Sequence, residues 1–140
     1  MEDRRQGDLI VIRMYSGEDF IPSLLEVCER HSVRTAVVLS SIGQLEDFEL
    51  GYFVKKGDYH PTRFDEPYEL IAVSGIISRE NGAYAPHLHA CLGGKEKQAV
   101  AGHLVRGKVK ITNETVLQAF DMDLGRVENP ETGLMDLKAA

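Results

Sequence analysis

The chain has 140 residues, 43% hydrophobic and 27% charged, which is typical of one folded globular domain and excludes a disordered chain. Twenty-two acidic against sixteen basic residues give a net charge of −6, which disfavours nucleic acid as a partner, because such affinity comes from neutralising phosphates. No apolar run reaches the roughly 20 residues that span a bilayer, and the first residues lead into no signal-peptide core, so we expect a cytoplasmic protein without a membrane partner.

A strand and a helix open the chain. The β-branched run Leu9–Ile12 predicts a first strand, which ends near Ser16-Gly17. A helix then extends to about His31, capped by Asp19 or Ser16, and Pro22 falls in its first turn, where proline is tolerated. Its apolar face is expected to contain Leu24, Leu25 and Cys28.

Further strands follow the helix. The run Ala36–Leu39 predicts a buried strand closed by Gly43, and the alternation of residues 48–54 predicts another strand with one mixed face. Residues 55–67 are polar and predict a loop with one short strand. Residues 69–78 predict a long strand, interrupted at Gly75 by a bulge or a close backbone approach.

The last third of the chain is also rich in strands. Beyond a hairpin described below, residues 108–111 and 116–122 predict strands, 128–133 a turn, and 134–137 a last short strand. About seven strands and one main helix predict a single domain over residues 1–140, of α/β (α+β) class. Its sheet is expected to be mixed or antiparallel rather than doubly wound and parallel.

Three of the five histidines lie in one short stretch, at His87, His89 and His103. On a strand, His87 and His89 share one face with Cys91, and the other face carries the core-type residues Leu88, Ala90 and Leu92. The turn-forming segment 93–97 predicts a hairpin centred near Glu96, which pairs residues 87–92 with 100–105. His103 then lies opposite His89, so three imidazoles from two strands can converge on one point.

Three clustered imidazoles indicate a metal site at His87, His89 and His103. Zinc is the first candidate cofactor, and nickel, copper or iron would also accept these nitrogen ligands. The alternative is that the histidines are polar surface or interface residues that bind nothing. Cys91 is a candidate fourth ligand or simply a core residue. The candidates to orient the imidazoles, each otherwise a solvated charge, are Glu18, Glu49 and Glu69.

Other chemistry-bearing residues have simpler interpretations. His31 at a helix end and His60 in a loop are expected on the surface. The two cysteines, Cys28 and Cys91, have no framework spacing, so no disulfide is expected. Gly93-Gly94-Lys95 lacks the helix and hydroxyl residue of a phosphate loop. Four aromatic residues either pack in the core or line a pocket: Tyr52, Phe53, Tyr59 and Tyr68.

Six short motifs in order resemble the domain conserved in plants and prokaryotes, the PPC domain, over about Leu9 to Leu124. They are Ser16-Gly17-Glu18-Asp19, Ser41-Ile42-Gly43, Glu49-Leu50-Gly51-Tyr52, Glu69 through Ser74-Gly75, His87-Leu88-His89 and Gly102-His103-Leu104. The resemblance implies a strongly bent sheet, a homotrimer and, as in prokaryotic members, metal binding by His87, His89 and His103. Plant members lack these histidines and carry a DNA-binding AT-hook, whose Arg-Gly-Arg-Pro core is absent from this sequence.

Three functions follow as hypotheses. In the first, a three-histidine metal keeps one coordination position open and acts on or holds a small molecule as a Lewis acid. In the second, the trimer is a DNA-associated or regulatory scaffold. In the third, the metal is structural and closes a subunit interface.

Overall fold

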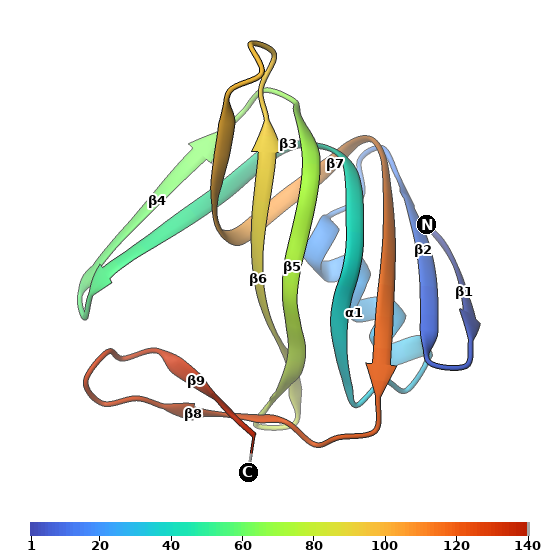
Figure 1. Ribbon diagram of the computed structural model, residues 1–140, viewed down its shortest axis with the longest axis vertical. Coiled ribbons are helices and arrows are strands. Elements are labelled where there is room, and N and C mark those ends of the chain that lie inside the picture. The colour runs from blue at the N-terminus through green and yellow to red at the C-terminus, as the bar shows by residue number, and fades with distance from the viewer. Residues whose placement is uncertain (140) are drawn as a thin grey trace.

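Seven antiparallel strands form one strongly bent sheet, and a single helix packs on one side of it (Figure 1). The computed structural model describes residues 1–139. Its elements in chain order are β1 (Glu2–Gln6), β2 (Leu9–Tyr15), α1 (Phe20–Arg30), β3 (Thr35–Lys55), β4 (Asp58–Phe64), β5 (Tyr68–Glu80), β6 (Ala83–Gly93), β7 (Ala99–Phe120), β8 (Gly125–Glu128) and β9 (Met135–Lys138). The predicted α+β class, with about seven strands and one main helix, is confirmed.

The large sheet has the order β1-β2-β7-β6-β5-β3-β4 and closes partly on itself, because β7 also pairs with β3. The first half of β3 lies between β5 and the end of β7, whereas its second half pairs with β4 and with the start of β7. Both long strands therefore turn through the middle of the molecule, as Figure 1 shows. The bend separates a half that packs on the helix from a half that holds β4 and the β6–β7 hairpin.

Strands β3 and β7 are longer than the sequence predicted. Each was expected as separate shorter strands, but β3 runs unbroken for 21 residues and β7 for 22. Gly43 does not end its strand: it has φ +148°, and a Cβ there would lie 2.2 Å from the Thr112 carbonyl oxygen. The chain bends at such close approaches and at shifts in the β3–β7 register, which keep the pairing continuous.

Two strands near the ends of the described chain were not predicted. One is β1, which pairs with β2. The short strand expected within residues 55–67 is present as β4. The predicted turn after residue 128 and the short strand after it, β9, are present. The strand β8 was not predicted, and it pairs with β9 in a hairpin separate from the large sheet.

One hydrophobic core lies between the helix and the sheet. The buried helix face consists of Phe20, Ser23, Leu24, Val27 and Cys28, at the spacing of an amphipathic helix, and Leu25 packs beside it. Asp19 takes the N-cap position, but its side chain makes no capping hydrogen bond. No helix among residues 1–139 is both long and apolar enough to cross a membrane.

Candidate metal centre

The three histidines come from the β6–β7 hairpin, in the register that the sequence predicted. His89 faces His103 across the two strands, and the neighbouring pair is Ala90 with Gly102. The opposite face of β6 is buried in the core through Leu88, Ala90 and Leu92. Burial of these apolar residues fixes the face to which His87 and His89 point, because a slip of one residue would turn the histidines into the core.

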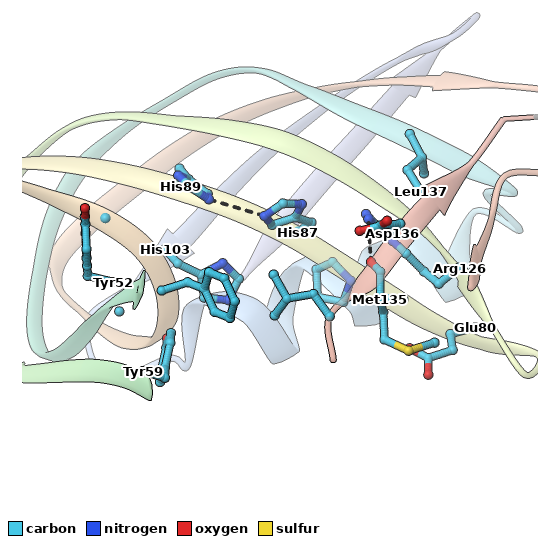
Figure 2. A pocket seen from close by; sticks show the side chains of 16 residues that line it. Tyr52, Tyr59, Glu80, His87, His89, His103, Arg126, Met135, Asp136 and Leu137 are labelled. Carbon is cyan, nitrogen blue, oxygen red and sulfur yellow. Dashed lines mark hydrogen bonds between the residues drawn. The ribbon is translucent and has the colours of Figure 1, made fainter. Parts of the chain in front are cut away.

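The imidazole rings form a compact triangle. One ligand nitrogen of each ring lies within 4.8 Å of the others, and the ring centroids are 5.1 to 5.6 Å apart. The Nε2 atoms of His87 and His89 are 3.2 Å apart, as the dashed line in Figure 2 marks. Zinc–nitrogen bonds of about 2.05 Å in a tetrahedron put two ligand nitrogens roughly 3.3 Å apart. This donor set therefore fits a zinc ion after a modest closing of the triangle.

The surroundings of the rings favour neutral imidazole, the form that binds metals. Burial, followed by the positive charges of His89 and Arg126, lowers the pKa of His87 below its usual value. Burial, followed by His87 and His89, lowers the pKa of His103. A neutral ring has a free lone pair at neutral pH, so metal binding does not have to displace a proton.

Glycines from the motifs allow strands to approach one another around the cluster. A Cβ at Gly75, where φ is +148°, would lie 2.0 Å from the His87 carbonyl oxygen. A Cβ at Gly51 would lie 1.6 Å from the Tyr59 hydroxyl oxygen. The expected close approach at Gly75 is thus confirmed, and Gly51 leaves room for Tyr59 beside the histidines.

A cavity of about 1040 Å³ opens over the histidines. Figure 2 shows the imidazoles in its middle, with Tyr52 and Tyr59 to one side and the residues of β8 and β9 to the other. Its wall is mainly apolar, and burial, with a smaller effect of Glu49, raises the pKa of Tyr59, which therefore stays a neutral phenol. Phe53 also lines the cavity, but Tyr68 packs against Phe48 and Phe64 instead.

The other candidate ligands do not join the cluster. Among the described residues, 1–139, the histidine triad is the one group of three or more close ligand atoms, and Cys91 lies outside it. The carboxylates proposed to orient the rings have other partners. Glu18 accepts from the N-terminal ammonium at 2.7 Å, Glu49 lies 3.8 Å from Arg106, and Glu69 accepts from Gln44 at 3.1 Å.

The remaining histidines pair with carboxylates outside the cluster. His31, which was expected on the surface, is half-buried at the C-cap of the helix and pairs with Asp3. His60 is on the surface, as expected, and pairs with Asp58 at 2.7 Å. Both cysteines are free, as expected.

Sequence reasoning missed the side of the cavity that the β8–β9 hairpin builds. Arg126, Met135, Asp136 and Leu137 all line it, and so does Glu80 at the end of β5. The signal was present in the turn sequence Asn129–Gly133, which separates two short segments and so indicates a hairpin. Nothing in the sequence indicated that this hairpin would fold over the histidines.

The chain matches a known family along most of its length. Residues 1–121 match the Plants and Prokaryotes Conserved (PCC) domain. The chain belongs to the PCC domain family. This is the family that the six motifs resemble, and the match contains all three histidines but ends before the β8–β9 hairpin.

Solved structures share the PCC fold. A plant- and prokaryote-conserved protein from Pyrococcus horikoshii is 26% identical with a TM-score of 0.82, and a metal-containing protein from Archaeoglobus fulgidus is 26% identical with a TM-score of 0.84; both alignments cover 94% of each chain. A protein from Bacteroides thetaiotaomicron whose name suggests DNA binding is 23% identical, with a TM-score of 0.93 over 99% of this chain and 96% of its own. No curated protein matches the chain.

Proposed function

We propose that His87, His89 and His103 bind a divalent transition metal, with zinc the first candidate, and that the cavity above them takes a small molecule. The observation that carries the proposal is the convergence of three imidazole nitrogens within 4.8 Å in the lining of a cavity. The similarity to a metal-containing archaeal protein of the same fold supports it.

The three imidazoles would hold the ion, and the cavity would give a small molecule access to it. A zinc ion with three protein ligands supplies Lewis-acid chemistry at its remaining position. The chain's own contribution is twofold. The wall of the cavity is mainly apolar, and the neutral phenol of Tyr59 supplies a hydrogen-bond donor in the same cavity. We place the protein in the cytoplasm, as a metal-binding protein that holds or transforms a small molecule.

We propose further that the chain assembles as a homotrimer. Ile42 on β3 and Ile71 on β5 are 50% and 57% exposed, although each is next to a buried residue of its strand. Exposed apolar side chains on a sheet face are typical of surfaces that another chain covers.

A nucleic-acid scaffold is the less supported function. The net charge of −6 opposes phosphate binding, and the structure whose name suggests DNA binding is too distant in sequence to show more than a fold. Weak binding to a random-sequence DNA duplex at low salt, lost at moderate salt, is expected. Tight binding with a steep salt dependence would favour the scaffold instead.

Metal analysis of the untagged protein tests the metal site. Wild-type protein is expected to contain or take up close to one zinc ion per chain, and the triple variant His87→Ala, His89→Ala, His103→Ala close to none. The matched control is the double variant His31→Ala, His60→Ala, which removes imidazoles outside the cluster and should keep the metal. Equal metal content in wild type and triple variant would refute the assignment.

A further inference from the structure

One cationic side chain faces the cavity from outside the histidine cluster. Arg126 on β8 is half-buried and lines the same cavity as His87, His89 and His103. Among residues 1–139, no carboxylate lies within 4.0 Å of its guanidinium group. A half-buried arginine that makes no direct ion pair is a natural partner for an anionic group of a ligand.

Neutral contacts hold the guanidinium in place. Its Nε donates to the Ser78 hydroxyl at 3.0 Å, and its Nη1 donates to the Met135 carbonyl at 3.4 Å. Ser78 is itself fully buried and donates to the Ala85 carbonyl, so it is a fixed anchor. The head group is therefore positioned in advance by neutral groups, without a direct ion pair to a carboxylate among residues 1–139. Figure 2 shows it on the hairpin side of the imidazoles.

The rest of the wall favours an apolar body with a single negative charge. Tyr59, Phe53 and Leu137 supply apolar surface, and most of the exposed lining is apolar. Two acidic residues, Glu80 and Asp136, also line the cavity. A phosphate dianion would meet repulsion from both, whereas a carboxylate brings the smaller charge.

We infer that the cavity takes a small organic carboxylate with an apolar body, whose carboxylate pairs with Arg126 and whose other end faces the histidine cluster. This inference rests on the proposed function, because it names the ligand class of the same cavity. It assigns Arg126 and the β8–β9 hairpin, which lie beyond the residues that match the family, to ligand recognition.

Chemical-shift titrations of the zinc-loaded protein test the inference with three probes. They are 4-phenylbutyrate, the neutral 4-phenylbutyramide of the same shape, and phenyl phosphate. Wild-type protein is expected to bind the carboxylate at least about tenfold more tightly than the amide, because a charge-assisted pair is lost in the amide. Arg126→Gln should abolish this preference, and Arg126→Lys should keep part of it.

Two further variants separate recognition from folding. Arg34→Gln removes the same charge from an exposed arginine that pairs with Asp121 and Asp123 outside the cavity, and should keep the preference. Ser78→Ala removes the anchor but not the guanidinium, and should weaken the preference only partly. If Ser78→Ala and Arg126→Gln weaken acid and amide equally, Arg126 has a structural role and the inference fails.

Other results would also overturn it. Tighter binding of phenyl phosphate than of 4-phenylbutyrate would indicate a phosphate ligand instead of a carboxylate. The absence of binding by all three probes would refute an anion site at Arg126. Repeating the titration on metal-free protein separates this inference from the metal site. If the protein binds no zinc but still prefers 4-phenylbutyrate over its amide through Arg126, only the proposed metal site is refuted. If it binds zinc but lacks this preference, only the proposed carboxylate ligand is refuted.

Discussion

At the scale of single residues, the site depends as much on glycines as on histidines. The sequence predicted the three histidines, their shared face and the pairing of His89 with His103, because strand alternation and a turn determine them. It also predicted a close approach at Gly75. It could not predict that Gly51 makes room for Tyr59, because that contact depends on how β4 folds back on β3.

Alanine at Gly75 tests the close approach of β5 and β6. The added Cβ would meet the His87 carbonyl oxygen at 2.0 Å in a backbone conformation that favours glycine, so we expect a stability loss of about 3 kcal/mol and weaker zinc binding. Gly82→Ala is the control, because φ there is +84° but the space is open, and about 1 kcal/mol is expected. Urea unfolding measures both, and equal losses would contradict the role given to the His87 contact.

The histidines should also make the metal-free protein sensitive to acid. The folded-state pKa values of His87 and His103 lie below the unfolded value of about 6.5, mainly because of burial. Between those values the unfolded chain binds more protons, so the stability present above pH 6.5 is lost as the pH falls through the folded-state pKa values. The free energy of unfolding, measured with urea from pH 7.5 to 5, should fall less steeply in the double variant His87→Gln, His103→Gln than in the wild type. Equal slopes for the two proteins would contradict this prediction.

At the scale of elements, local patterns located the strands but not their length or their partners. The helix Phe20–Arg30 matches its prediction because its signals are local. Strands β3 and β7 were expected in pieces, because glycines and polar residues in their middle resemble turns, yet pairing between the two strands carries each through its bend. The turn and last strand of the β8–β9 hairpin were predicted, but its position beside the histidines was not, because that position depends on contacts with distant residues, such as Lys56 with the Pro130 carbonyl at 2.9 Å.

Removal of the β8–β9 hairpin should separate the metal site from ligand recognition. A chain ended after Leu124 loses Arg126, Met135 and Leu137 from the cavity but keeps all three histidines. We expect unchanged zinc content, a stability loss of about 1 kcal/mol from the lost anchoring hydrogen bonds, and no preference for 4-phenylbutyrate over its amide. Metal analysis, urea unfolding and titration measure these. Loss of zinc from a folded truncated chain would show that the hairpin supports the metal site.

At the scale of the whole molecule, the bent sheet gives the chain one packed side and one exposed side with apolar residues. The core lies against the helix, while Ile42 and Ile71 are on the outer surface. Sequence patterns predicted the buried face of β6, but Leu39, which was expected within a buried strand, is 52% exposed. Such patterns cannot determine which surface meets another chain, because an exposed isoleucine has the same sequence signature in a monomer and in an assembly.

A charge on the exposed sheet surface tests the proposed trimer. Light scattering after size exclusion is expected to give a mass three times that of the chain for wild type. Ile71→Glu should give the mass of one chain, since burying an unpaired carboxylate between subunits is costly. Val127→Glu, on the β8–β9 hairpin, changes a side chain of similar exposure and should leave the mass unchanged. A wild-type protein with the mass of one chain would refute the trimer.

The three imidazoles all come from one hairpin that spans residues 83–120, whereas Arg126 and its neighbours follow the large sheet at the end of the chain. Evolution can therefore change the histidine cluster and the β8–β9 hairpin separately. On the two proposals made above, substitutions on the β8–β9 hairpin are expected to change which small molecules the cavity takes, while the three histidines stay in place. Related proteins that share the proposed metal site could in this way differ in ligand specificity.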